Sequence, residues 1–362
     1  MQLTDEQRQS LSTIGWRGEI PPEAVAADGV TLVRIVAQHR NGYRVHDGAA
    51  EFPAQPAPRF LRRGADPAER PAVGDFVLVE PTNPLLIREV LPRRSELSRA
   101  AAGERYQRQT IATNIDWVIV LMGLDGDFNP RRIERYLALI QGSGAQPVIV
   151  LTKRDKVDAE TFADAADSVR ALLPAQVELH GINAKDPASI APLLAHLKHG
   201  DTAVLVGSSG AGKSTLTNTL LGIERQATNS VRGNDSRGRH TTTHRALIAL
   251  PSGGCLIDTP GMRELKLTGD EELAESSFGD IEALALECRF GDCGHGSEPG
   301  CAVRAALESG TLDAARWANF QKLRAELAAT NDTLEAQLRR KTLARVANKA
   351  LNKRLHEKYR GN

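Results

Sequence analysis

The fold class follows from nine residues, Gly207-Ser208-Ser209-Gly210-Ala211-Gly212-Lys213-Ser214-Thr215. They fit the pattern G-x-x-x-x-G-K-[ST], a loop whose backbone N–H groups cradle nucleotide phosphates, with Lys213 on the β- and γ-phosphates and Ser214 on Mg²⁺. The apolar run 202–206 before the loop predicts a buried strand, and residues 216–221 after it predict a helix. A chance glycine-rich turn is the alternative, and this context disfavours it. The loop therefore indicates a nucleotide-phosphate site.

The composition is that of a globular chain with two or three domains. Of the 362 residues, 41% are hydrophobic and 25% charged. Aromatic residues make up only 4%, which argues against a large stacking surface for single-stranded nucleic acid. We find neither a signal peptide nor an apolar window of about 18 residues, so we expect a cytoplasmic protein with no membrane partner.

The net charge of +1 is unevenly distributed along the chain. Residues 339–360 hold nine bases and one acid, a net charge of +8, which leaves −7 for the remainder. Such a basic tail suggests an acidic partner, most simply nucleic acid. A solvated, frayed helix end is the alternative.

Two further apolar runs, 117–122 and 147–151, flank the helix-like segment 129–140 and predict a parallel α/β sheet. The second run leads into Thr152-Lys153-Arg154-Asp155, beyond the carboxyl end of a strand, where ligands bind in such sheets. A carboxylate at Asp155 accepts hydrogen bonds from both N1–H and the amino group of guanine, while the stem of Lys153 packs on the purine. Adenine lacks this pair of donors. On its own the tetrad is as often a solvated turn, but beside a phosphate loop it predicts a GTP site.

Other segments fit around the same nucleotide. Asn183 and Ala184 follow a predicted strand, and the Ala184 N–H is a candidate donor to the base oxygen, although this segment alone is unspecific. The strand that ends at Asp258 runs into D-x-x-G, which places Asp258 on Mg²⁺ through water and the N–H of Gly261 on the γ-phosphate.

A polar segment rich in hydroxyl groups, Arg237-Gly238-Arg239-His240-Thr241-Thr242-Thr243-His244, lies between these motifs. We predict a switch that orders when one of its threonines, with Thr241 and Thr242 as the candidates, meets Mg²⁺. An ordinary flexible loop is the alternative.

The order of the motifs is unusual. In ordinary GTPases the phosphate loop comes first and the base-reading tetrad last, whereas here the tetrad precedes the phosphate loop and D-x-x-G comes last. The sequence therefore predicts a circularly permuted GTPase. Because the segment after Gly261 feeds directly into the C-terminal domain, we expect nucleotide state to move that domain. Protease sensitivity beyond Arg263 that is equal with GDP and with a GTP analogue would contradict this.

Three of the four cysteines lie within fourteen residues, in the pattern Cys288-x₄-Cys293-x-His295-x₅-Cys301. Three thiolates and one imidazole fill the tetrahedral coordination of zinc and leave no open position, so we predict one structural Zn²⁺. A coincidental cluster of core cysteines is the alternative.

The predicted fold is multidomain α/β. Residues 1–26 are expected to form a loosely packed arm, and the short strands and turns of 27–98 an OB-type β-barrel, with an unspecific β-sandwich left open. Residues 93–109 are polar and basic and predict a linker, for which a solvated loop is preferred slightly to an RNA contact. The permuted GTPase domain is expected over 99–268 and the zinc-binding helical domain, with its basic tail, over 269–362.

Together, the permuted order, G-S-S-G-A-G-K-S-T, G-R-H-T-T-T, D-T-P-G-M-R-E and the zinc pattern resemble the family of ribosome small-subunit-dependent GTPase A, the RsgA (YjeQ) family. The resemblance implies an OB-fold, a permuted GTPase domain and a zinc domain that act on the small ribosomal subunit and its rRNA in late maturation. It also implies that the subunit stimulates hydrolysis of GTP to GDP. We expect a monomer.

Three positions depart from common GTPase patterns. Thr152 replaces the commoner asparagine, so we expect one tie between base loop and phosphate loop to be absent and guanine affinity to be modest. Asn183-Ala184 replaces Ser-Ala, which leaves the bonding within that loop open. Met262 stands where many GTPases have a water-orienting glutamine, so we expect slow basal hydrolysis and a catalytic group from elsewhere. His240 is the nearby candidate, with ribosomal RNA either ordering its loop or supplying the contact itself.

Two competing functions remain. One is a permuted GTPase switch that acts on another RNA or protein, and the other is an RNA-binding module with a regulatory nucleotide site. The intact phosphate loop and D-x-x-G disfavour the second.

Overall fold

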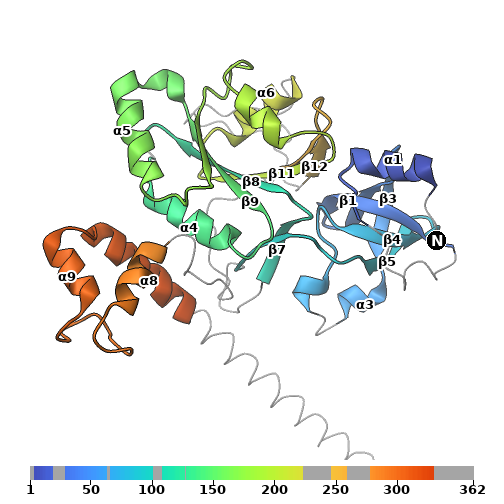
Figure 1. The fold of residues 1–362 in the computed structure, drawn as a ribbon. Coiled ribbons are helices and arrows are strands. Elements are labelled where there is room, and N and C mark those ends of the chain that lie inside the picture. Colours follow the sequence, from blue (N-terminus) through green and yellow to red (C-terminus); the bar gives the residue numbers. More distant parts are fainter. Residues whose placement is uncertain are drawn as a thin grey trace, which may run out of the picture.

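The computed structural model describes residues 4–18, 29–62, 66–100, 108–126, 128–222, 246–258 and 278–329. A β-barrel (blue) and a small helical domain (orange) lie on opposite sides of a central α/β domain (green to yellow; Figure 1). No helix in these ranges is long and apolar enough to cross a membrane.

The N-terminal strands form a closed barrel. Strand β1 pairs with both β2 and β4, and β3 runs parallel to β5, which closes the ring in the order β1-β2-β3-β5-β4. This confirms the OB-like barrel, whose interior is filled by β-branched residues such as Val33, Ile35 and Val77. The strands are β1 (Thr31–His39), β2 (Gly42–His46), β3 (Glu51–Pro56), β4 (Phe76–Glu80) and β5 (Leu85–Val90).

The first helix is part of the core, which corrects the expectation of a loosely packed arm. Helix α1 (Asp5–Thr13) begins with a capping box in which Thr4 and Gln7 bond each other's backbone N–H. Its Leu11 and the following Ile14 are buried against Leu32 and neighbouring apolar side chains of the barrel. Two short turns, α3 (Pro58–Leu61) and η1 (Pro67–Glu69), lie in the proline-rich segment between β3 and β4.

The segment predicted as a linker forms a β-hairpin instead. Strands β6 (Glu96–Ala100) and β7 (Arg108–Thr113) pair with each other, and Leu97 and Ile111 are fully buried. Arg93 is also fixed, since its guanidinium bonds the carboxylates of Asp75 and Glu96. The sequence had suggested a loop because the basic residues outnumber these few buried side chains. The domain boundary predicted at residue 98 falls inside β6.

The central domain is a mainly parallel sheet, as predicted. Its strand order is β10-β9-β8-β11-β13-β12, and only β12 is antiparallel to its neighbour in this sheet. Strand β12 also pairs with β1 of the barrel at Ala246 and Ala37, so barrel and central sheet are continuous. The strands are β8 (Trp117–Gly123), β9 (Gln146–Thr152), β10 (Glu178–Gly181), β11 (Thr202–Gly207), β12 (Ala246–Ala249) and β13 (Cys255–Asp258).

Helices cover both faces of this sheet, which is why its strands are apolar on both sides. Helices α4 (Arg131–Ile140) and α5 (Ala159–Arg170) share one apolar cluster with the sheet. Helix α6 (Lys213–Leu221) and η3 (Ala191–His196) share another.

The C-terminal domain contains α8 (Gly279–Leu286), α9 (Ala302–Ser309) and a helix over residues 314–329. Gly310 ends α9 in the left-handed conformation. The domain lies against α4 of the central domain (Figure 1), where Arg316 bonds the buried Glu134 and Arg135 forms a two-bond pair with Glu326.

Candidate nucleotide site and metal centre

The predicted nucleotide motifs meet at one edge of the sheet. Register pairs Gly123 of β8 with Thr152 of β9, Leu121 of β8 with Gly207 of β11, and Leu151 of β9 with Gly181 of β10. The loops that follow these strands therefore leave the sheet at the same carboxyl edge, where ligands of α/β domains bind. They contain the base tetrad, the phosphate loop and Asn183-Ala184.

The phosphate loop has the strand–loop–helix context that the sequence predicted. It leaves β11 at Gly207, whose φ of +148° and close packing require glycine, because a Cβ there would lie 2.3 Å from the Leu121 carbonyl oxygen. Gly210 and Gly212 also have positive φ, and α6 begins at Lys213. Ser214 and Thr215 thus lie in the first turn of α6, where free N–H groups and the helix dipole favour anions.

The side chain of Lys213 folds back onto the start of the phosphate loop. Its Nζ donates to the carbonyl oxygens of Gly207 and Ser208, each at 2.7 Å. Burial lowers the pKa of Lys213, while the charge of Asp258 raises it. Asp258 is itself buried at the end of β13. The structure thus places the lysine of the phosphate loop and the carboxylate at the end of β13 near enough for their charges to interact.

The base tetrad is tied to the phosphate loop, and this corrects one expectation. Thr152 is fully buried, and its Oγ1 donates to the Ala211 carbonyl at 2.7 Å. In this chain the Thr152 hydroxyl therefore makes the link between the base loop and the phosphate loop that the side-chain amide of an asparagine makes in other GTPases. A threonine reaches this carbonyl because the two loops already lie within one side-chain length, which the sequence alone does not reveal.

The other tetrad residues have different environments. Lys153 is in the left-handed conformation, with φ of +61°, and its Nζ forms an ion pair with Asp125. Arg154 stacks on Phe162, and its Nη1 donates to the Val157 carbonyl at 2.9 Å. The Asp155 carboxylate lies 3.5 Å from Lys156 Nζ. Because Asp155 is exposed, its carboxylate remains accessible to a nucleotide base.

The loop after β10 has a defined internal structure. The Asn183 N–H donates to Ser189 Oγ, and its Oδ1 accepts from the Lys185 N–H. The Ala184 carbonyl accepts from Thr219 Oγ1 of α6, which attaches this loop to the phosphate-binding helix. Thr219 had no sequence signal beyond its place on that helix.

Several predicted residues lie outside the described ranges. They are His240, Thr241, Thr242, Gly261, Met262 and the basic tail.

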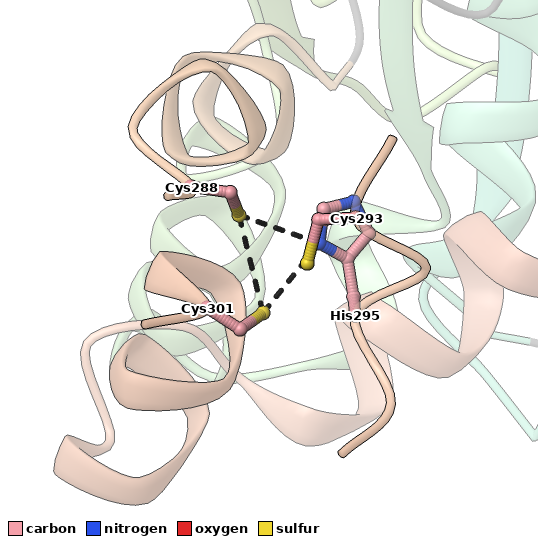
Figure 2. A group of neighbouring side chains, drawn as sticks. All are labelled: Cys288, Cys293, His295 and Cys301. Carbon is pink, nitrogen blue, oxygen red and sulfur yellow. Dashed lines mark hydrogen bonds between the residues drawn. The ribbon is translucent and has the colours of Figure 1, made fainter. Parts of the chain in front are cut away.

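The predicted metal ligands come together (Figure 2). All four donor atoms of Cys288, Cys293, His295 and Cys301 lie within 4.8 Å of one another. The Cys288 and Cys301 sulfurs are 3.9 Å apart, and His295 Nδ1 lies 3.5 and 3.6 Å from them. A tetrahedral zinc ion with Zn–S of about 2.3 Å and Zn–N of about 2.05 Å requires edges of about 3.8 and 3.6 Å. A disulfide requires about 2.05 Å, so the geometry fits zinc.

Residues that the sequence did not single out shape this loop. The Glu298 carboxylate accepts from the N–H groups of Gly294 and Gly296, at 3.0 and 2.7 Å. Cys301 caps α9, accepting from the Arg304 N–H, and Trp317 packs edge-on against the His295 ring. An acid among closely spaced glycines is the signal that points to Glu298.

Comparisons with known proteins identify the family and the fold. The RsgA GTPase family model matches residues 90–268, and the ABC transporter model matches 191–350, a range that also holds the phosphate loop. A Xanthomonas axonopodis pv. citri protein named "Small ribosomal subunit biogenesis GTPase RsgA" is 54% identical, covering 93% of this chain and 94% of its own. The protein of the same name from Xanthomonas oryzae pv. oryzae (strain MAFF 311018) is 55% identical over 91% and 92%.

Two solved structures share the fold. YjeQ from Thermotoga maritima matches with a TM-score of 0.58 and 23% identity over 83% of this chain and 99% of its own. YloQ, described as a circularly permuted GTPase, matches with a TM-score of 0.56 and 22% identity over 85% and 97%.

Proposed function

The chain belongs to the RsgA GTPase family, and we propose that it hydrolyses GTP to GDP and phosphate while bound to the small ribosomal subunit, in late maturation of that subunit. The GTPase activity follows from membership of this family. The partner is inferred from relatives more than 50% identical over nearly the full chain, which are named for small-subunit biogenesis. Such a role also carries the expectation of a cytoplasmic, monomeric protein in contact with rRNA.

The observation that carries the GTP assignment is the hydrogen bond from Thr152 to Ala211. It fixes the base tetrad against the phosphate loop, so that one nucleotide can meet both. We propose that GTP contacts three loops and the end of β13. The residues are Thr152, Lys153, Arg154, Asp155, Asn183, Ala184, Gly207, Ser208, Ser209, Gly210, Ala211, Gly212, Lys213, Ser214, Thr215, Asp258 and Gly261.

Ser214 and Asp258 would hold Mg²⁺, the ion that bridges and neutralises nucleotide phosphates in such sites. Ser214 is in the first turn of α6 and Asp258 at the buried end of the neighbouring strand β13. One of Thr241 and Thr242 would join them when the switch segment closes. Lys213, already beside the loop, would move its hydrogen bonds from backbone carbonyls to phosphate oxygens.

Hydrolysis needs a group that orients water, and Met262 cannot supply it. We assign this role to His240 and expect the subunit to order its segment. Replacing His240 with alanine should then leave GTP binding intact and abolish subunit-stimulated turnover. Unchanged stimulation would remove His240 from the mechanism.

We propose that Cys288, Cys293, His295 and Cys301 hold one structural Zn²⁺. Four protein ligands fill the coordination of the ion, so this centre orders the loop rather than taking part in hydrolysis.

The deciding experiment measures GTP hydrolysis by the full chain alone, with small subunits, with large subunits, and with ATP in place of GTP. We expect slow basal turnover and a large rise only for GTP with small subunits. A rise with neither subunit would favour a permuted GTPase that acts on another RNA or protein. Nucleotide binding without turnover under every condition would favour an RNA-binding module with a regulatory site.

A further inference from the structure

A second group of metal-ligating side chains lies away from both the nucleotide edge and the cysteine centre. Glu178 and His180 are two residues apart on β10 and therefore share a face, and His196 ends η3, which packs over the same sheet. The donor atoms of the three residues lie within 4.8 Å of one another. Glu178 begins β10, whereas the guanine-side loop follows its other end, so the group is separate from the proposed GTP contacts.

The two imidazoles converge on one carboxylate oxygen. Glu178 Oε2 lies 2.9 Å from His180 Nε2 and 3.3 Å from His196 Nε2. His196 is only 4% exposed, and its ring packs edge-on against Trp117 with centroids 4.4 Å apart. That packing fixes the direction of His196 Nε2, so the buried ligand of the group is preorganised.

The spacing is close to what a divalent ion requires. An ion about 2.05 Å from nitrogen and oxygen ligands in tetrahedral geometry sets its ligands about 3.3 Å apart. The Glu178–His196 distance matches this value, and the Glu178–His180 distance is shorter by 0.4 Å. The Glu178 side chain is 54% exposed, so it can withdraw to admit the ion and offers an entry path from solvent.

The donor set also selects the class of ion. Two imidazoles and one carboxylate suit zinc, cobalt and nickel, and not the hard cations Mg²⁺ and Ca²⁺, which prefer oxygen ligands throughout. Three protein ligands leave one position for water, which distinguishes this group from the closed cysteine centre.

We propose that Glu178, His180 and His196 form a second, open binding site for a divalent transition metal ion of the zinc, cobalt and nickel class. The bound ion links the edge strand β10 to η3, two segments joined in the protein itself by hydrogen bonds to Glu178. With two imidazoles and a single carboxylate, the site binds more weakly than the three thiolates and imidazole of the cysteine centre, so the two sites load in sequence.

The test removes bound metal from the untagged full chain with a strong chelator, dialyses the chelator away and then titrates Co²⁺ into the protein. We expect the first equivalent to give the intense thiolate charge-transfer band of the cysteine centre and a second, weaker equivalent to add only d–d absorption. His180→Asn should abolish the second equivalent and keep the first. Glu178→Gln should weaken the second at least tenfold. Both residues are partly exposed, so these variants should fold.

The matched control is His199→Asn, which removes an exposed histidine three residues beyond His196 and should leave both equivalents unchanged. A single equivalent in the unaltered chain would overturn the proposal. So would a second equivalent that persists unchanged in His180→Asn, because the ion would then lie elsewhere. Neither result bears on GTP hydrolysis, which is measured separately.

Discussion

Replacing Gly207 with alanine should destabilise the protein more than replacing a glycine whose added Cβ would meet open space. A Cβ at this position would lie 2.3 Å from the Leu121 carbonyl oxygen and 3.2 Å from its carbon, so β11 has to separate from β8 at the start of the phosphate loop. Its φ of +148° adds backbone strain of about 1–2 kcal/mol. Overpacking against backbone adds about 1–3 kcal/mol, so we expect a total loss of about 2–5 kcal/mol in the free energy of unfolding.

Gly222 provides the matched control, because it has a φ of +64° and an added Cβ would meet no atom within 4 Å. Gly222→Ala should therefore cost only the backbone strain, about 1–2 kcal/mol. Urea unfolding of both variants, followed by far-ultraviolet circular dichroism, measures the difference. If Gly207→Ala unfolds at the same urea concentration as Gly222→Ala, the close approach of β11 to the Leu121 carbonyl is refuted as the reason for this glycine.

Thr152→Val keeps the side-chain shape and removes the donor to Ala211, so GDP affinity in a fluorescent-nucleotide titration should fall about fivefold, the equivalent of about 1 kcal/mol; unchanged affinity would mean that other contacts align the two loops. A strong chelator should expose the amides of residues 288–301 to hydrogen exchange, since structural zinc supplies the folding energy of such loops; full protection without zinc would contradict the metal assignment. Arg316→Leu removes the nearer of two cations beside the fully buried Glu134 and leaves Arg131 at 3.7 Å, so the loss should stay below the ~3–5 kcal/mol of a fully unpaired buried charge, and exchange in the helix over 314–329 should accelerate; wild-type protection would show that the pair does not anchor the domain.

The parts of the fold that were predicted correctly have a local signal. The central strands are buried on both faces and therefore read as continuous apolar runs, and the phosphate loop and cysteine spacing are set by the geometry of their ligands. Strand β3 (Glu51–Pro56) lacks such a signal, because it contains two prolines and its only buried side chain is Ala54. The hairpin β6–β7 was predicted as a linker because its basic residues outnumber its buried apolar residues.

Buried polar contacts between distant segments left no such signal. Arg34 lies in β1, and nothing in the sequence around it indicates that its guanidinium is fully buried on Phe76. It donates to the carbonyls of Gly74 and Asn114 and to Thr202 Oγ1, and so joins the barrel to the first residue of β11, the strand that leads into the phosphate loop. Burial lowers its pKa to about 10, which still leaves it charged at neutral pH. Contacts of this kind depend on how three segments meet, and only the assembled structure shows them.

The attachment of the C-terminal domain limits how nucleotide state can act on it. Glu134 of α4 is fully buried and accepts hydrogen bonds from Arg316 and from Asn319. Separating the domain from α4 would break these bonds and the Arg135–Glu326 pair and would expose the apolar side chains that the two share in one cluster, whereas coupling between sites is typically about 1–3 kcal/mol. A nucleotide-driven shift of the segment after Gly261 is therefore too weak to pull the domain off α4. We expect the domain to move together with α4, so that nucleotide-dependent protease cleavage falls beyond Arg263 in the connecting segment and not at the contact between Glu134 and the helix over 314–329.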